Sequence, residues 1–214
     1  MNWNSDVKWN PDKDLINVSK DTNESGVEIF SHEKYKHSVK ATFEIIENLE
    51  ELGMPKKDEQ IRFVTFKSFN AVLFLNHICE TEIIEHLILA VYSFNYDASV
   101  LINDLIKQGK IKKATILMSN LRNKAHREKE QITRDMLVNN PNVDLFFASS
   151  HAKIMAMKTQ KNNHYILEGS GNLSFNSRIE QYCFDNNKGL FDFTFKWMQE
   201  IKIFLKGRKE LVLT

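Results

Sequence analysis

Apolar side chains recur along this chain at two spacings, and the two spacings predict alternating helices and strands. A spacing of three to four residues predicts helices over residues 31–52, 68–79, 97–108, 122–138 and 190–205. Alternating or continuous apolar residues predict strands over residues 61–66, 83–93, 111–118 and 143–147, of which 83–93 has the pattern of a buried central strand. This order of elements indicates an α/β fold in which helices sandwich a mixed β-sheet.

The first 30 residues differ from the rest, because they are rich in Asn, Asp, Ser and Lys with only scattered apolar side chains. We predict that residues 1–30 are an extended or poorly ordered N-terminal arm and that residues 31–214 form the α/β domain. Trp3 and Trp9 leave two interpretations open. The arm docks through them on the domain or on a second subunit, or it is a floppy tail.

Composition sets the scale of the molecule and excludes a general attraction to polyanions. The chain has 214 residues, which suits one domain with additions or at most two small ones, and 42% of its residues are hydrophobic, enough for a sizeable core. Its formal net charge is +1, so there is no overall electrostatic bias toward nucleic acid or a membrane surface. Any nucleic-acid binding must therefore use a local patch.

The sequence also predicts the compartment and the absence of a bound metal. Cys79 and Cys183 lie far apart without a CxxC partner, which is typical of reduced, buried thiols in a cytosolic protein. The polar, acidic start is unlike a signal peptide, and the longest apolar run, Ile83–Phe94, is interrupted by Glu85 and His86. We therefore expect a cytoplasmic protein without membrane contact. No zinc or calcium ligand spacing is found, so no metal and no other cofactor is expected.

Residues 149–182 combine apolar runs with an unusual set of polar side chains. His151 and Lys153 alternate with Ala152 and Ile154, which predicts a strand with the two polar side chains on one face. A turn at Gln160–Asn163 leads to a second apolar run that ends in Gly169-Ser170-Gly171-Asn172, and Glu180 follows a Ser/Asn-rich connection. If the two strands are neighbours, these polar groups gather around one point.

That set of groups suits a phosphate. Lys153, Asn172 and the Ser170 hydroxyl can bind its non-bridging oxygens, and the small residues Gly169 and Gly171 let backbone N–H groups approach the same oxygens. The His151 imidazole can attack phosphorus as a nucleophile, while Glu180 can hold the other ring nitrogen and fix the tautomer. The positive charge comes from side chains, so the chemistry requires no metal.

HxK, then GSxN, then a downstream Glu resembles the active-site signature of the phospholipase D superfamily. The resemblance covers roughly residues 82–214 and is most specific at His151, Lys153, Gly169, Ser170, Asn172 and Glu180. It implies a phospholipase D-like domain over residues 31–214 and a phosphodiesterase that passes through a phosphohistidine on His151. The family motif reads HxKxxxxD, and this chain departs from it because Lys158 stands at the Asp position, which is usually a structural support.

The resemblance also implies an assembly, a substrate and further pocket residues. A single HxK…GSxN motif is typical of the small nuclease-like members, which pair two copies in a homodimer with the active site at the two-fold interface. DNA or RNA is the favoured substrate of so small a chain. Tyr92 and Ser93 end the predicted central strand at the sheet edge where ligands usually bind, so they are candidate pocket residues.

Several alternatives remain open at this stage. The chain could be a non-catalytic nucleic-acid-binding or assembly module that keeps the fold, or a phosphodiesterase that acts on a phospholipid-type substrate. His151 could be an ordinary surface histidine and Gly169–Asn172 an ordinary turn. The helix over residues 122–138 carries five basic side chains that could hold a nucleic-acid backbone, but interleaved acidic residues favour a solvated helix.

Overall fold

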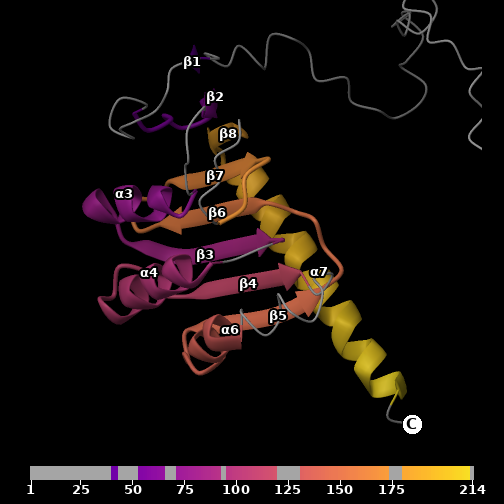
Figure 1. Ribbon diagram of the computed structural model, residues 1–214. Helices are drawn as coiled ribbons and strands as arrows, with labels where there is room; N and C mark the ends of the chain where they lie inside the picture. The colour runs from indigo at the N-terminus through magenta and orange to yellow at the C-terminus, as the bar shows by residue number, and fades with distance from the viewer. Residues whose placement is uncertain are drawn as a thin grey trace, which may run out of the picture. The chain divides into compact units, whose positions relative to one another are not determined.

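The computed structural model describes residues 40–42, 53–65, 71–92, 95–119, 131–173 and 180–212 (Figure 1). Several sequence predictions lie outside these residues: the N-terminal arm over residues 1–30, Ser93 as a pocket residue, and the first part of the helix expected over residues 122–138. The division of the chain into an arm and a domain beginning at residue 31 therefore stays a prediction.

The described strands form one mixed sheet of eight strands (Figure 1), in the order β1-β2-β8-β7-β6-β3-β4-β5. Neighbours are parallel in the pairs β1/β2, β3/β4 and β4/β5, and antiparallel in the pairs β2/β8, β8/β7, β7/β6 and β6/β3. The strands are β1 Lys40–Thr42, β2 Gln60–Thr65, β3 Ile84–Val91, β4 Ala114–Ser119, β5 Val143–Ala148, β6 Ile154–Thr159, β7 His164–Gly169 and β8 Glu180–Asn186.

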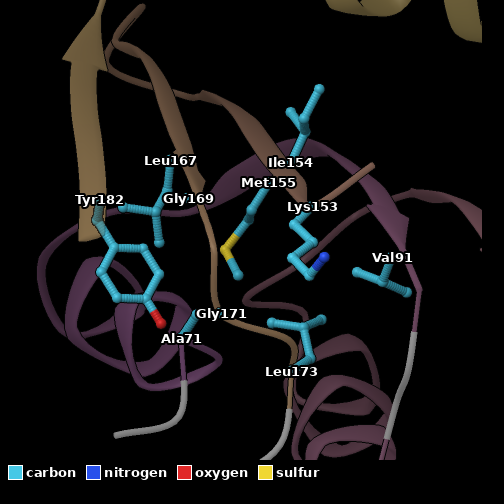
Figure 2. A pocket seen from close by; sticks show the side chains of 10 residues that line it. All are labelled: Ala71, Val91, Lys153, Ile154, Met155, Leu167, Gly169, Gly171, Leu173 and Tyr182. Atoms are coloured by element: carbon cyan, nitrogen blue, oxygen red, sulfur yellow. The ribbon is translucent and has the colours of Figure 1, made fainter. Parts of the chain in front are cut away.

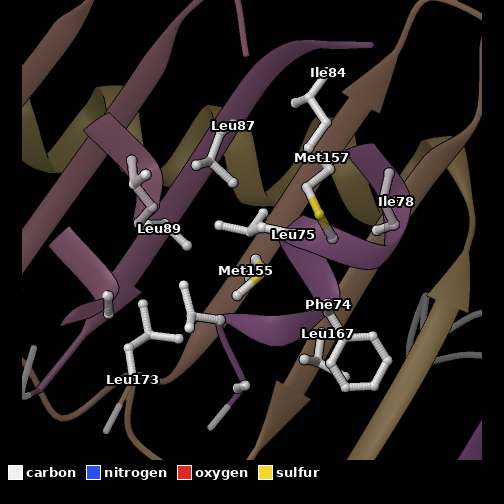
Figure 3. Close-up of a cluster of buried hydrophobic side chains, with 14 of the residues drawn as sticks. Phe74, Leu75, Ile78, Ile84, Leu87, Leu89, Met155, Met157, Leu167 and Leu173 are labelled. Carbon is white, nitrogen blue, oxygen red and sulfur yellow. The ribbon is translucent and has the colours of Figure 1, made fainter. Parts of the chain in front are cut away.

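Helices cover the sheet through two separate apolar layers. The described helices are α3 Leu73–Thr81, α4 Tyr96–Lys107, α6 Gln131–Val138 and α7 Lys188–Val212. Helices α3, α4 and α6 pack on one layer, which contains Leu87 and Leu89 of β3 (Figure 3). The second layer contains Ile88 and Ala90 of the same strand and is packed against α7. The predicted α/β fold, a mixed sheet sandwiched by helices, is confirmed.

Strand β3 shows why the sequence pattern predicted a central strand. Successive side chains of a strand point to opposite faces, and each face of β3 meets an apolar layer. Leu87, Ile88, Leu89 and Ala90 are accordingly all fully buried. Burying the side chain of a large aliphatic residue contributes about 1.5–3 kcal/mol, so this continuous run is a main source of stability.

One predicted helix is wrong where it can be compared with the structure. The apolar spacing predicts a helix over residues 31–52, but Lys40–Thr42 form strand β1, with Lys40 paired to Ile61 in parallel register. Pairing with the edge of β2 satisfies backbone hydrogen bonds that a helix would otherwise make within itself. Three residues are too few to show the alternation of a strand. The helical spacing of apolar residues around them therefore predicted the wrong element.

Two corrections concern the segment that carries the candidate chemistry. His151 and Lys153 were expected on a strand, but β6 begins only at Ile154. Ile154 is the first paired residue of β6, and its partners are Ala90 of β3 and Glu168 of β7. Residues 151–153 therefore precede the paired part of the strand. Strand β8, Glu180–Asn186, is not among the strands that the sequence predicts.

Further described features are a glycine at a helix end and two free cysteines, of which Cys183 is less buried than predicted. Gly109 follows α4 with a φ of +71°, a left-handed conformation in which glycine commonly ends a helix. Both cysteines are free thiols; Cys79 is buried and Cys183 is half-buried. Burial raises the pKa of Cys79 to about 11, so it stays protonated near neutral pH. No helix among the described residues is both long enough and apolar enough to cross a bilayer.

Candidate active site

Strand order brings four chain segments to one end of the sheet. In an antiparallel pair, the start of one strand lies beside the end of its neighbour. The start of β6 therefore lies beside the ends of β3 and β7, and the start of β8 lies beside the end of β7. The residues that flank these strand ends include His151 and Lys153 before β6, Tyr92 after β3, the Gly169–Asn172 segment at the end of β7, and Glu180 at the start of β8.

His151 and Lys153 interact directly with each other. Lys153 Nζ lies 3.2 Å from His151 Nδ1 and 3.5 Å from the carbonyl oxygen of His151. An ammonium group has only donors, so the Nδ1 atom accepts in the first contact. A neutral imidazole in this arrangement carries its proton on Nε2. The His151 side chain is exposed, so a substrate can reach it from solvent.

The Tyr92 ring lies against the His151 imidazole. The two ring centroids are 4.4 Å apart, and the ring planes are inclined by 34°. Lys153 Nζ lies 5.9 Å from the centroid of the Tyr92 ring, within the range of a cation–π contact. Tyr92 was predicted from its place at a strand end, and the structure brings it to the predicted nucleophile. Lys153, Tyr92 and His151 thus form one group of side chains in contact.

The Gly169–Asn172 segment is fixed to the first residues of β8. The Ser170 hydroxyl donates to Glu180 Oε2 and accepts from the Gln181 backbone N–H at 3.1 Å. The Ser170 backbone N–H donates to the Gln181 carbonyl at 3.0 Å. Glu180 is buried, with 6% of its surface exposed. The carboxylate of Glu180 therefore orients the serine of the motif in this structure.

The expected contact between Glu180 and the His151 ring is not among the described contacts of His151. The ring's described partners are Lys153 and Tyr92. The carboxylate instead interacts with Ser170. The role of Glu180 as the group that holds the second ring nitrogen therefore stays a prediction.

Both glycines of the motif pack on the ring of Tyr182. A Cβ added at Gly169 would lie 2.4 Å from Tyr182 Cδ1, and one added at Gly171 would lie 1.9 Å from Tyr182 Oη. The ring itself is stacked on Phe63, with centroids 5.1 Å apart and planes inclined by 19°. Burial, with a smaller effect from the Glu180 carboxylate, raises the pKa of Tyr182, so its hydroxyl stays protonated. These contacts explain why this segment requires small residues.

Sequence reasoning missed Tyr182 as a site residue, although a signal for it exists. Glu180, Tyr182 and Phe184 alternate with more exposed residues, which is the period of a half-buried strand. That pattern places Tyr182 on the same face as Glu180, and Tyr182 pairs with Gly169 at the end of β7.

A small, mostly apolar pocket connects the two groups of site residues (Figure 2). Lys153 borders it from one side, and the ring of Tyr182 borders it from the other with its hydroxyl near Gly171. The lining residues are Ala71, Val91, Lys153, Ile154, Met155, Leu167, Gly169, Gly171, Leu173 and Tyr182. The lysine of HxK and the glycines of GSGN thus face the same space.

Asn172 has a buried oxygen that its neighbours do not satisfy. Its Oδ1 atom is inaccessible to solvent and has no hydrogen-bond partner among the described residues. A buried acceptor without a donor costs about 1–3 kcal/mol. An ordered water that donates to this oxygen would recover that energy. Phosphodiester oxygens have no proton to donate, so the predicted contact of Asn172 with a phosphate would use its amide nitrogen.

Lys158, at the position of the family's Asp, points away from the site. Its Nζ atom lies 2.8 Å from Glu85 Oε2, and both side chains are partly exposed. Lys158 pairs with His86 and His164 across the sheet, near the opposite end of β6 from Lys153. Lys158 therefore lies away from the pocket that Lys153 borders.

The other candidate features do not form a second site among the described residues. No group of three or more His, Cys, Asp and Glu side chains in this part of the chain could hold a metal ion. Arg134 is a described member of the basic helix, and its guanidinium lies 4.5 Å from the centroid of the Phe147 ring. That contact fits a packing role for Arg134.

Comparison with known proteins finds similarity in structure. No protein-family model and no curated protein sequence matches the chain. Polyphosphate kinase from Porphyromonas gingivalis aligns with a TM-score of 0.50 and 11% identity, over 67% of this chain and 24% of that protein. Nuc, a phospholipase D family member from Salmonella typhimurium, gives a TM-score of 0.47 and 13% identity over 66% of this chain and 93% of that one. A yeast tyrosyl-DNA phosphodiesterase gives a TM-score of 0.31 and 20% identity over 56% of this chain and 31% of that one.

The alignment with the polyphosphate kinase shows similarity of fold alone. The chain resembles the phospholipase D superfamily in the order of its motifs, HxK, GSxN and a downstream Glu. It spans about a quarter of the length of the polyphosphate kinase with which it aligns.

Proposed function

We propose that this protein is a phosphodiesterase that cleaves DNA or RNA through a covalent intermediate on His151. One observation carries the proposal: strand order brings HxK, GSGN and Glu180 to a single end of the sheet, where Lys153, Gly169 and Gly171 line one pocket. These groups are far apart in sequence, and each has a distinct use in phosphoryl transfer. Lys158 pairs with Glu85 away from these residues. The replacement of the family's Asp by Lys158 therefore removes none of the residues proposed to act on the phosphate.

In the first step a ring nitrogen of His151 attacks phosphorus, and the bond from phosphorus to the leaving oxygen breaks. The leaving oxygen takes a proton from a general acid. In the second step water attacks the phosphohistidine, the phosphorus–nitrogen bond breaks, and a base removes the proton of the water. The products are a free hydroxyl and a phosphomonoester, and His151 is regenerated.

Substrate binding must change the contact between His151 and Lys153. While Nδ1 accepts from Lys153, the neutral ring carries its proton on Nε2 and cannot attack through that atom. A phosphate attracts the Lys153 ammonium to its non-bridging oxygens, and the ring proton can then move to Nδ1. Glu180 is the predicted partner for that proton, which gives a defined role to a carboxylate that now accepts from Ser170.

The charge that develops on the non-bridging oxygens is stabilised by side chains. Lys153 supplies a full positive charge, and the Asn172 amide nitrogen supplies donors. A metal ion is not required for this arrangement. Activity is accordingly expected to survive EDTA, and loss of activity on chelation with recovery on adding magnesium would contradict this part of the proposal.

The test compares His151→Ala with wild type on bis(p-nitrophenyl) phosphate, single-stranded DNA, duplex DNA and RNA. Removing a positioned nucleophile should lower kcat by several orders of magnitude on whichever of these is a substrate. His77→Ala is the matched control, since His77 lies on α3 beside Glu80 and outside the pocket. Retained activity in His151→Ala would refute the mechanism.

Two alternatives correspond to other outcomes of the same assay. The contact of Lys153 with His151 Nδ1 favours a non-catalytic nucleic-acid-binding module, because it holds the ring in a form that cannot attack through Nε2. That function predicts binding of nucleic acid by wild type with no turnover of any substrate. A phospholipid-type phosphodiesterase predicts turnover of phosphatidylcholine and none of DNA or RNA.

A further inference from the structure

His151 lacks the support that usually fixes a catalytic side chain. It lies three residues before the first residue of β6, beyond the last paired residue of the sheet, and its side chain is exposed. The apolar layers of the fold therefore do not pack around the ring. A nucleophile must nevertheless be held in line with the phosphorus atom, because small errors in position lower the rate strongly.

The Lys153 contact cannot provide this support during the reaction. Lys153 Nζ is the hydrogen-bond partner of the ring at Nδ1, but the same ammonium is needed at the phosphate oxygens. Once Lys153 turns to the substrate, the contact between Tyr92 and the His151 ring is the described ring contact that remains. The centroid separation of 4.4 Å lies at the close end of the range for interacting rings.

The position of Tyr92 is set by the sheet. Val91 is the last residue of β3 and is buried, and Ala90 pairs with Ile154, the first residue of β6. Tyr92 therefore follows directly from one of the most deeply buried strands, whereas His151 lies in an irregular segment. The rigid element orients the less rigid one.

We propose, on the basis of the phosphodiesterase function above, that Tyr92 is a positioning residue for the nucleophile. The Tyr92 ring packs against the imidazole of His151 and so limits rotation of the imidazole. The edge of the imidazole remains free to face the phosphate. The contact is made by the ring face, so it depends on an aromatic ring at position 92. The phenol hydroxyl contributes little to it.

The test is a series at position 92 with steady-state kinetics on the substrate found for the wild type. Tyr92→Leu should lower kcat by about 10- to 100-fold with KM changed less than about threefold, because position and not binding is lost. Tyr92→Phe should retain kcat within about threefold of wild type, since it keeps the ring face. Tyr96→Leu is the control, because Tyr96 is an exposed tyrosine at the start of α4.

A spectroscopic measurement tests the contact separately from the activity. The nearby aromatic ring should displace the His151 Cε1–H resonance in the proton NMR spectrum. Tyr92→Leu should move that resonance toward the random-coil position, and Tyr92→Phe should leave it displaced. An unchanged resonance in Tyr92→Leu would overturn the contact whether or not the protein is an enzyme.

The kinetic outcomes separate this proposal from the function on which it rests. If His151→Ala remains active, the proposed mechanism fails while the NMR measurement still reports on the ring contact. If His151 is essential but Tyr92→Leu raises KM for nucleic acid and leaves kcat unchanged, Tyr92 binds substrate and the positioning role is wrong. A loss of activity in Tyr92→Phe equal to that in Tyr92→Leu would also overturn it.

Discussion

At the scale of single residues, His86 illustrates how the surroundings of a side chain determine its protonation. It lies on β3 against Phe195 of α7, and its Nε2 lies 2.9 Å from the Thr115 hydroxyl. Burial, with Lys113 and Lys158 adding to it, lowers the pKa of His86 from 6.5 to about 4. The folded protein therefore favours the neutral ring, whereas the unfolded chain takes up a proton as the pH falls below 6.5.

This difference predicts a loss of stability in mild acid. Between pH 7 and pH 5 the unfolded state gains a proton at His86 that the folded state does not, so the free energy of unfolding should fall. We expect a loss of about 1 kcal/mol, a value reduced for solvent screening of this half-exposed ring. Urea unfolding of wild type and His86→Gln at both pH values measures it, since glutamine does not titrate and His164 is common to both. An equal pH dependence in the two proteins would contradict the assignment.

Asn172 should separate activity from stability. Asn172→Ala removes an amide that is predicted to stabilise charge on the phosphate, so kcat should fall by about 100-fold or more. The same change removes a buried acceptor that has no described partner, so the free energy of unfolding should change by less than about 0.5 kcal/mol or should rise. Asn139→Ala, at an exposed position after α6, serves as the control. Unfolding of Asn172→Ala at native conditions would show that the amide is structural.

At the scale of elements, the packing of the Gly169–Asn172 segment on β8 depends on the absence of a side chain at Gly171. A Cβ added at Gly171 would lie 1.9 Å from Tyr182 Oη. The Tyr182 ring cannot move freely because it stacks on Phe63. Gly171→Ala should therefore displace the GSGN segment and destabilise the protein by about 1–3 kcal/mol, as overpacking does. It should also reduce activity, because Ser170 and Asn172 flank the displaced residue.

A thermal unfolding series with activity measurements checks this prediction. Gly189→Ala is the matched control: its Cβ would meet the Asn187 side-chain oxygen at 3.2 Å, and it lies in the first turn of α7. Adding Tyr182→Leu to Gly171→Ala should recover part of the lost stability if the ring is the obstacle. Failure of the double variant to recover any stability would place the clash elsewhere.

The elements that could be predicted from sequence are those with several residues of clear period. Strand β3 is continuous and apolar because both its faces are buried, and its burial agrees with that pattern. The order HxK, hairpin, GSGN was enough to place the motif residues at one end of an antiparallel pair. Hydrophobic pattern and turn chemistry determine these features locally, so sequence reveals them.

The features that could not be predicted depend on contacts between distant segments. The three residues of β1 have no pattern of their own and are strand through pairing with β2. His151 stands outside β6 because the pairing of β6 with its two neighbours ends at Ala90 and Glu168, which alternation along one strand cannot show. The stack of Tyr92 on His151 depends in the same way on where two strands end relative to each other.

At the scale of the whole molecule, the proposed chemistry requires a second acid. A single histidine that attacks phosphorus cannot also protonate the leaving oxygen on the opposite side. The sequence contains one GSxN segment, Gly169–Asn172, so one chain can form one such site. The simplest source of the acid is His151 of a second copy across a two-fold axis. Exposed Phe193 and Ile203 on α7 could supply apolar area to a dimer of this kind.

A shared site predicts that an inactive chain will inactivate the wild-type chain with which it forms a dimer. In a mixture refolded or co-expressed with equal amounts of wild type and His151→Ala, half of the wild-type chains pair with a defective partner. Activity per wild-type chain should then fall to about half, and to about one-tenth with a tenfold excess of the variant. The control is an excess of His77→Ala, which keeps both site histidines and should leave activity per wild-type chain unchanged. Sedimentation at micromolar concentration should show a dimer. A fully active monomer, or activity independent of added His151→Ala, would refute both the shared site and the two-histidine mechanism, because each chain would then hold its own acid.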